Sequence, residues 1–554
     1  MMNEEFKDIV DKFIRLWATV SPQEAFGQGM REYAGFLADY SPSQIQTYLL
    51  FLRNIKKELD LVNVEILSKE EHVNYLVLLN KIDSLNYEIV DSNALEINPL
   101  AYSSAAFVFD YLLKAYAPLD QRLDELIVHL NQLPKFYETA KNNLVIENIA
   151  PENSNMAILM LSGIIEFLSN LKSEVKEIAG DEILPNKLLE EIEIASKTGG
   201  DAVKSFVDFL ISNKDNFKGS FRLGEELFSK MLFKNERVDL SISEILKAGE
   251  KNLERNWKEF IYAASQIDEN KNPSEIIKDI KLKHPTAESL FSDTQNMLVD
   301  IRQFLIDSEF VTVPSEVIPK VIPTPKAFRQ WAFAAMDTPG ALEKKATDSY
   351  YYISPPDENW TEEEKEDWLQ TFNYPGLLDI SVHEAFPGHF LHNLHNQRTK
   401  MLVAKLFGAY HFWEGYALYV EEAMWEHGFQ KGDYEYRMAQ LIETLLRNVR
   451  LICSIKLHTD PNFSVEDATN MFMEKVFMGR KPAESEAQRG TFDPGYLNYA
   501  LGKLMIEKLR EDYKKEKGAE YKIKTFHDEL LSFGAPPVPL LRKFMLKSDD
   551  GKIL

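Results

Sequence analysis

Two histidines and two glutamates in one stretch of the chain have the types and order of a catalytic metal site. The stretch covers residues 379–422 and contains His383, Glu384, His389 and Glu414. A catalytic zinc ion takes about three nitrogen or oxygen ligands and keeps one position open for water. A further carboxylate beside the first histidine can take a proton from that water, whose pKa the metal lowers to about 7. The pattern therefore predicts one Zn²⁺ per chain and hydrolytic chemistry.

The spacing of the two histidines sets a condition on the local backbone. In the short HExxH motif the histidines are four residues apart and share one helix face, whereas His383 and His389 are six apart. At about 100° per residue, an unbroken helix would separate them by roughly 120°. Pro387 cannot donate to the carbonyl of His383, and its ring clashes there. We therefore expect the helix to kink, bulge or restart at Pro387-Gly388, which can bring both imidazoles to one side.

The sequence around these residues resembles the motifs of a known family. HEAFPGHFLH at 383–392 and WEGYALYVEE at 413–422 look like the HExxPGHHxQ and EGWALYxE signatures of the domain of unknown function 885 family, a zincin-like group. They also look like a stretched form of the HExGH motif and downstream glutamate of carboxypeptidase Taq and the thimet-type oligopeptidases. Phe390 stands where the family usually has a second histidine. The resemblance implies the zinc ligands His383, His389 and Glu414 and the general base Glu384.

Other histidines in the stretch are alternative ligands. His389, His392 and His395 follow one another at i+3 spacing, and His411 lies one turn before Glu414. A lone His-Glu pair usually lies on the surface without a function. It is far less frequent by chance for His-Glu to be followed in order by Pro-Gly-His and a later Glu-Gly-aromatic. We interpret His392 and His395 as structural or solvated side chains. His411 is interpreted as a candidate partner that orients a metal ligand.

A tyrosine run before the metal-site helix predicts a strand. Residues 348–354 read DSYYYIS, which is typical of a half-buried strand. The residues alone favour an ordinary strand and a substrate-binding strand equally. The resemblance implies that Tyr351 and Tyr352 lie on a strand that holds a peptide backbone by β-addition. The preceding segment 311–328 carries prolines among β-branched residues, so we expect extended chain or edge strands there, in a linker or lid.

A helix expected over 433–458 carries basic side chains on one face. Arg447, Arg450 and His458 match a pattern of the resembled family, although two positions between them differ from it. A basic stripe of this kind is equally typical of a solvated helix face. The resemblance implies that Arg450 binds substrate and that His458 is a catalytic residue that can stabilise an oxyanion.

Two residues near the end of the chain complete the predicted site. A tetrahedral oxyanion needs a hydrogen-bond donor besides the metal, and a tyrosine hydroxyl can serve; we predict Tyr499 in that role. The resemblance places Arg489 near the cleft, where its guanidinium could hold a substrate carboxylate through two hydrogen bonds. Gly490 replaces the aromatic residue that usually follows this arginine in the family.

Composition excludes several classes of partner. The chain has 63 Lys and Arg against 87 Asp and Glu, a net charge of −24, and such a surface repels nucleic acid and anionic membranes.

The longest clean apolar run, 156–165, is too short to span a bilayer. The one cysteine, Cys453, excludes an intrachain disulfide framework. Members of the resembled family are often lipoproteins, but the amphipathic N-terminus has no leader pattern. We therefore expect a cytoplasmic protein; its oligomeric state is not predicted.

These observations predict a mainly α, zincin-like metallopeptidase fold. We expect a helical scaffold and cleft wall over 1–310 and a catalytic zincin-like region over 311–554, intertwined as one unit, with a small β element beside the metal-binding helix. The predicted function is a zinc metallopeptidase of carboxypeptidase or oligopeptidase type, acting on a peptide or small amide. The alternatives are a zinc hydrolase of a non-peptide amide or ester, and a non-catalytic metal-binding helical scaffold. Retention of Glu384 argues against the last, because a structural zinc needs no base.

Overall fold

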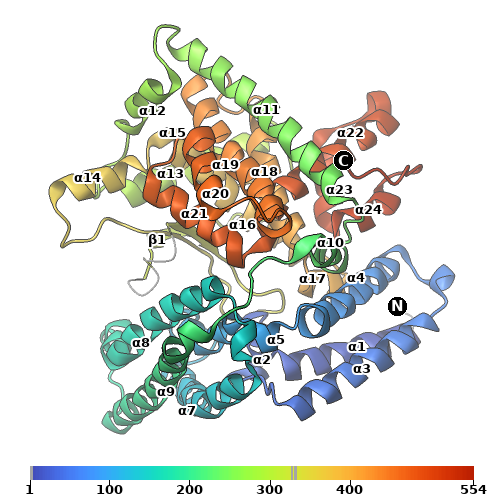
Figure 1. Ribbon diagram of the computed structural model, residues 1–554. Helices are drawn as coiled ribbons and strands as arrows, with labels where there is room; N and C mark the ends of the chain where they lie inside the picture. The colour runs from blue at the N-terminus through green and yellow to red at the C-terminus, as the bar shows by residue number, and fades with distance from the viewer. Residues whose placement is uncertain (1–3, 326–328, 330–332) are drawn as a thin grey trace. The chain divides into compact units, whose positions relative to one another are not determined.

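The protein is mainly helical and divides into two compact units. The structure is a computed structural model that describes residues 4–325, 329 and 333–554 (Figure 1). Helices account for 71% and strands for 2% of it, so the predicted mainly α class is confirmed. The first unit is Met1–Leu223 with Pro339–Thr347, and the second is Gly224–Thr338 with Asp348–Leu554.

The first unit is built around two long helix pairs, in which α9 packs along both α7 and α8. A short excursion of the chain, 339–347, belongs to this unit, since Leu342 donates its amide to the carbonyl of Gln28 at 2.8 Å and Glu343 pairs with Arg31. The helices of the unit are α1 (Glu4–Val20), α2 (Pro22–Gly27), α3 (Pro42–Asp60), α4 (Lys69–Asn86), α5 (Ala94–Ile97), α6 (Phe109–Leu113), α7 (Leu119–Asn143), α8 (Pro151–Ala179) and α9 (Asn186–Asn213).

Helix α8 is long and apolar. Within the described part of the chain it is the one helix whose length and composition would allow it to cross a membrane. A core helix of a soluble protein has the same length and composition, and α8 packs along α9. The helix is therefore weak support for a membrane span.

The second unit contains the whole of the predicted metal site. Its helices are α10 (Gly224–Glu236), α11 (Ile242–Ile267), α12 (Pro273–Lys281), α13 (Leu290–Asp307), α14 (Glu362–Gln370), α15 (Tyr374–Glu384), α16 (His389–Asn396), α17 (Leu402–Leu406), α18 (Tyr410–Glu426), α19 (Tyr434–Thr459), α20 (Val465–Val476), α21 (Arg480–Phe492), α22 (Asn498–Lys517), α23 (Ile523–Ser532) and α24 (Val538–Met545). The division of the chain at Leu223 differs from the expected boundary at 310, because α11 packs along α19 in the second unit.

Two helix contacts set the position of α18, which carries Glu414. α18 packs along α22, and a Cβ atom on Gly415 would lie 2.5 Å from the backbone of Gly502. Glycine at both positions therefore allows the two backbones to approach closely. α15 contacts both α18 and α19. The helix that bears the first histidine is thus packed against the helix that bears the glutamate.

A small sheet completes the second unit. Its strands are β1 (Lys320–Pro323), β2 (Ala334–Asp337) and β3 (Tyr350–Ile353), in the order β1-β3-β2. β1 is parallel to β3, and β2 is antiparallel to it. The predicted strand over 348–354 is confirmed, and β1 is an extended segment within the proline-containing stretch 311–328. Residues 326–328 of that stretch lie outside the described residues.

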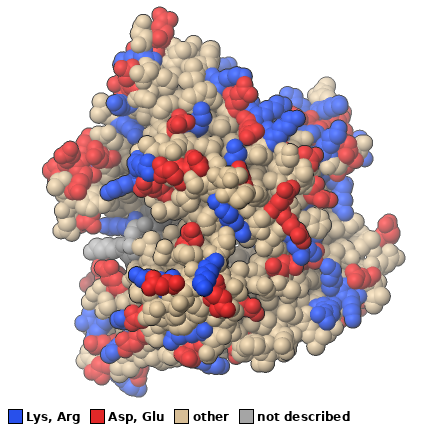
Figure 2. All heavy atoms as spheres, viewed as in Figure 1, with Lys and Arg blue, Asp and Glu red and all other residues tan. Residues whose placement is uncertain are grey.

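Charged side chains of both signs lie on the surface. On the face shown in Figure 2, acidic and basic groups are interspersed. Alternation of this kind limits the strength of any local field of one sign, although the total charge is −24.

Candidate metal centre

Two short helices carry the histidines, and the break between them brings the rings together. α15 ends at Glu384 and α16 begins at His389, so the predicted interruption at Pro387-Gly388 is confirmed. The backbone folds back so closely that a Cβ atom on Gly388 would lie 1.7 Å from the carbonyl oxygen of His383. Only glycine fits such a position without a shift of the backbone. The two histidine rings meet edge to face, with centroids 4.9 Å apart.

His383, His389 and Glu414 form a group of candidate metal ligands. Their ligand atoms all lie within 4.8 Å of one another. The Oε2 atom of Glu414 is 3.5 Å from Nε2 of His383 and 3.3 Å from Nε2 of His389. Ligand atoms about 2.0–2.1 Å from a tetrahedral zinc ion are separated from one another by about 3.3 Å. The donor set and its spacing therefore fit a zinc ion.

Opposite charges stabilise one another in this group. Burial raises the pKa of Glu414, but His389 and His383 outweigh burial and hold that pKa well below its usual range. Burial lowers the pKa of His383, whereas its hydrogen bonds to Glu414 and Glu421 raise it to about 10. A cation that binds these ligands must therefore displace a proton, because imidazole binds a metal only in its neutral form.

Glu421, two helical turns after Glu414 on α18, orients the first histidine. Its Oε1 atom is 2.7 Å from Nδ1 of His383, and its side chain is buried. A carboxylate oxygen accepts this hydrogen bond, so Nδ1 donates, and Nε2 is the nitrogen that faces Glu414 and would bind a metal once its proton is displaced. A carboxylate behind a ligating histidine in this way fixes the ring and raises its basicity.

Asp379 adds a second buried carboxyl group behind the histidine. It lies one turn before His383 on α15 and accepts a hydrogen bond from the hydroxyl of Tyr436 at 3.2 Å. Burial, and then the nearby charge of Glu421, raise the pKa of Asp379 well above its usual range. Asp379 is therefore expected to be neutral where Glu421 is charged, because two adjacent buried carboxylates cannot both ionise easily.

Glu384 lies at the edge of the sheet. Its Oε2 atom accepts a hydrogen bond from the backbone amide of Met336 in β2 at 2.9 Å. This amide points away from β3, so the outer edge of β2 faces the carboxylate. The predicted base is thus held beside an edge strand and next to the first histidine in the chain.

The structure corrects the prediction for Tyr351 and Tyr352. Both lie on β3, which is the middle strand and is paired on both sides, so its backbone has no edge for a peptide to join. Tyr351 is fully buried, with its hydroxyl 3.5 Å from that of Ser381 on α15. The ring of Tyr352 stacks on that of Tyr350. β-Addition would need the outer edge of β2.

The remaining histidines of the stretch have other partners. His411 is not a partner of a ligand as interpreted from the sequence: its Nδ1 contacts Glu236, and its Nε2 accepts the amide of Val538 at 2.8 Å. Both ring nitrogens are therefore used within the protein. His392 is buried beside the carbonyl of Gly534, and burial lowers its pKa to about 3. His395 contacts the carbonyl of Thr312. The structural interpretation of His392 and His395 agrees with these contacts.

Arg450 and His458 bind groups of the protein. Arg450 makes a two-bond ion pair with Glu486, at 2.7 Å for each bond, and it is buried. The Nε2 atom of His458 is 2.8 Å from the carbonyl oxygen of Gly490. These contacts join α19 to α21. Neither residue belongs to the ligand group. The guanidinium of Arg450, which was predicted to bind substrate, already donates two hydrogen bonds to Glu486.

Tyr499 and Arg489 lie together beside Tyr410, which is one helical turn before Glu414 on α18. The rings of Tyr410 and Tyr499 are 5.8 Å apart, and Arg489 donates to the hydroxyl of Tyr410 at 3.3 Å. Arg489 also binds Asp493 at 3.0 Å. The structure thus brings these two predicted residues next to the ligand helix.

Sequence reasoning missed Glu421, Asp379 and Met336. Glu421 lies in the quoted motif WEGYALYVEE, seven residues after Glu414, which is two helical turns and hence the same helix face. That spacing is a signal that could have found it. Met336 acts through its backbone amide, and a contact of this kind cannot be predicted from the residue type.

Comparisons with solved structures show the fold. A protein described as a "putative lipoprotein of unknown function" from Shewanella oneidensis matches with a TM-score of 0.83 and 23% identity, over 98% of this chain and 100% of its own. A "putative lipoprotein" from Colwellia psychrerythraea matches with a TM-score of 0.74 and 18% identity, over 97% of this chain and 98% of its own. The likeness therefore extends over nearly the whole of all three chains.

Comparison with family models decides the family. No curated protein matches this chain. A family model described as "Bacterial protein of unknown function (DUF885)" matches residues 22–545, which include every residue of the candidate metal centre. The family expected from the HEAFPGHFLH and WEGYALYVEE motifs is therefore confirmed, and the chain belongs to the DUF885 family of bacterial proteins.

Proposed function

We propose that the protein is a zinc-dependent hydrolase, of metallopeptidase type, with a zincin-like catalytic region. The observation that carries the proposal is the geometry of the ligand group, in which one oxygen of Glu414 lies 3.5 and 3.3 Å from the Nε2 atoms of two histidines. These separations match the edges of a tetrahedral zinc site. When bound, zinc supplies a polarised substrate carbonyl and a water of lowered pKa.

Glu384 is proposed to move the proton. Its carboxylate follows His383 directly in the chain, and one of its oxygens is held by the amide of Met336 at 2.9 Å. With one oxygen fixed, the other can take a proton from the attacking water and return it to the leaving amine. Glu421 supports this step indirectly, since it holds the ring of His383 in one orientation.

The outer edge of β2 is proposed to hold the peptide backbone. A strand that joins this edge would lie along β2 beside Glu384, with the amide of Met336 left to the carboxylate. The cluster of Tyr410, Tyr499 and Arg489 is proposed to stabilise the oxyanion or to bind a substrate carboxylate. Tyr499 keeps the predicted role of stabilising the oxyanion. Arg450 and His458 are proposed to have structural roles, since they join α19 to α21.

Two observations point to different cellular locations. The single cysteine favours the cytoplasm, whereas both structural relatives are described as lipoproteins, which points to a place outside it. One cysteine is compatible with either compartment, since it forms no disulfide in either. We therefore propose only the chemistry, and fractionation of cells with detection of the full-length protein decides the location.

Metal content tests the ligand set. The protein is purified without chelator, and its zinc is measured by mass spectrometry for the wild type, His389→Ala and Glu414→Ala. We expect about one zinc per chain in the wild type and a loss in both variants, because three ligands are needed. The exposed variant Glu254→Ala is the control and should keep its zinc. A wild-type chain that stays free of zinc after zinc is supplied would overturn the proposal.

A substrate panel separates the peptidase from the other hydrolases. Quenched fluorescent peptides, N-acyl amino acids and simple esters are incubated with the zinc-loaded protein. Cleavage of peptides that needs a chain long enough to join the edge of β2 supports the metallopeptidase. Cleavage confined to esters or to small amides would replace it by the alternative hydrolase, with the same metal centre.

A further inference from the structure

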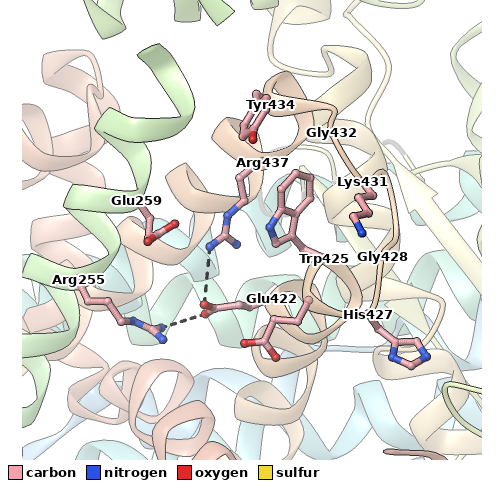
Figure 3. Close-up of a pocket in the computed structure, with 11 residues that line it drawn as sticks. Arg255, Glu259, Glu422, Trp425, His427, Gly428, Lys431, Gly432, Tyr434 and Arg437 are labelled. Atoms are coloured by element: carbon pink, nitrogen blue, oxygen red, sulfur yellow. Dashed lines mark hydrogen bonds and ion pairs between the residues drawn. The ribbon is translucent and has the colours of Figure 1, made fainter. Parts of the chain in front are cut away.

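A pocket lies beyond the metal centre on the same helix, at the end of α18. Its volume is about 620 Å³, within the range of small-molecule sites. α11, α18 and the start of α19 line it, and Figure 3 shows Arg255 and Arg437 converging on Glu422 from α11 and α19. The function proposed above uses none of these residues.

Three cations surround the one buried carboxylate of this pocket. Glu422 contacts the ammonium group of Lys503, which is fully buried, and accepts from Nη2 of Arg255 at 3.0 Å. Nη2 of Arg437 lies 3.8 Å from the other oxygen of Glu422. Burial raises the pKa of Glu422, but the three cations outweigh it and lower that pKa to about 2. Glu422 is therefore ionised and fully engaged by its partners.

The two guanidinium groups keep donors for a further acceptor. A guanidinium has five N–H donors, so Glu422 cannot satisfy both guanidinium groups, even though Lys503 also pairs with Glu507 at 3.7 Å. Arg437 is only 6% exposed; Nη1 donates to Gln440 at 2.6 Å, whereas the 3.8 Å separation of Nη2 from Glu422 is too long for a hydrogen bond. Arg255 donates to Glu422 at 3.0 Å, and the side chain of Arg255 is 45% exposed. Both arginines line the pocket, and each has more N–H donors than the bonds named here use.

Aromatic rings form another wall of the pocket. The guanidinium carbon of Arg437 lies 5.6 Å from the centre of the Trp425 ring, and Tyr434 also lines the space. The rings of Trp425 and Tyr434 are 6.1 Å apart. A flat apolar group can stack on such rings while an attached anion meets the arginines.

We propose that this pocket binds a small ligand in which a carboxylate or phosphate group is joined to a flat apolar body. The oxyanion accepts hydrogen bonds from Arg255 and Arg437, and the apolar body lies against Trp425 and Tyr434. This inference is independent of the hydrolase proposal, because none of the pocket residues belongs to the ligand group of the metal centre.

Four probes of similar size test the charge and the chemistry of the ligand. Phenylacetate, phenyl phosphate, benzyl alcohol and benzylamine are titrated into the full-length protein by calorimetry. The protein carries His389→Ala and is treated with chelator, so that anion binding at a metal ion is not counted. We expect one or both anions to bind about tenfold or more tightly than the alcohol and the amine, because charge-assisted hydrogen bonds favour the anion.

Two arginine variants locate the binding. Arg255→Gln should weaken the anion by about tenfold or more, because it removes a charged donor from the site. Arg480→Gln, with a similar side-chain exposure of 50%, removes the same charge from α21 and should leave the affinity unchanged. Trp425→Leu should weaken phenylacetate or phenyl phosphate more than it weakens acetate or inorganic phosphate.

Distinct outcomes would overturn the inference. Preferential binding of benzylamine would show that the acidic residues of the rim, such as Glu259, set the charge preference. Equal loss of affinity in Arg255→Gln and Arg480→Gln would mean a diffuse charge effect without a site. A stronger response to phenyl phosphate than to phenylacetate assigns the ligand to the phosphates, and the reverse assigns it to the carboxylates. If neither anion binds, the proposal is wrong.

Discussion

Glu421 and Glu422 are consecutive residues on α18 with opposite surroundings. Glu421 is buried behind His383 and accepts a hydrogen bond from its imidazole at 2.7 Å. Glu422 is buried among Lys503, Arg255 and Arg437. Since successive residues of a helix point about 100° apart, one carboxylate faces α15 and the other faces α11 and α22.

The difference shows how a helix can separate a metal centre from a structural ion cluster. On the Glu421 side, carboxylates hydrogen-bond to imidazoles. A cation that displaces the imidazole protons can use these rings as ligands. On the Glu422 side, the protein supplies its own cations, so the carboxylate needs no metal. Changes on the first side should therefore alter metal binding and turnover, and changes on the second side should alter stability.

The largest expected effect is the loss of turnover in Glu384→Gln. The amide can still accept the hydrogen bond of Met336 but cannot take a proton, so turnover should fall by about 10²–10⁴-fold. Zinc content should remain about one per chain. Peptide cleavage is measured at saturating zinc beside the exposed control Glu254→Gln, which should match the wild type. Unchanged cleavage in Glu384→Gln would remove this residue from the mechanism.

On the other side of the helix, Glu422→Gln should destabilise the fold. The change leaves Lys503 and Arg437 buried with less opposite charge, and breaking a buried ion pair costs about 3–5 kcal/mol. Chemical denaturation measures the free energy of unfolding, and zinc content is measured on the same sample. Loss of zinc with an unchanged unfolding midpoint would reverse the assignment of the two glutamates.

Glu421→Gln should weaken zinc binding without abolishing it. Loss of the charge behind His383 should lower the zinc affinity by about 10–100-fold. Competition with a chromogenic chelator gives the affinity. The comparison of the two sides would fail if Glu422→Gln weakened zinc as much as Glu421→Gln does.

The smallest expected effect is a dependence of stability on pH. The pKa of Glu422 is about 2 in the folded chain against its ordinary value of 4.5, so its contribution is present above pH 4.5 and is lost as the pH falls through 2. The difference in unfolding free energy between the wild type and Glu422→Gln should therefore shrink by about 2 kcal/mol from pH 6 to pH 3. Denaturation at both pH values tests this, and a difference independent of pH would contradict the lowered pKa.

Much of the metal centre could be predicted from the sequence, since its determinants are local. The order of His383, Glu384 and His389, with a proline and a glycine before the second histidine, predicted both a ligand set and a helix interruption, and α15 and α16 have that interruption. The strand near Tyr351 followed from its β propensity. The predicted roles of Arg450 and His458 were less reliable, because their partners Glu486 and Gly490 come from another helix.

The sequence by itself determined the donor types, their spacing and the points where the helices must break, because these follow from side-chain chemistry and from the restrictions of proline and glycine. It did not distinguish Glu421 from Glu422, which are the same residue type at adjacent positions. Only the tertiary structure decided that one holds His383 and the other meets Lys503. The packing of α15, α11 and α22 around α18 makes that choice, since it depends on contacts between segments far apart in the chain.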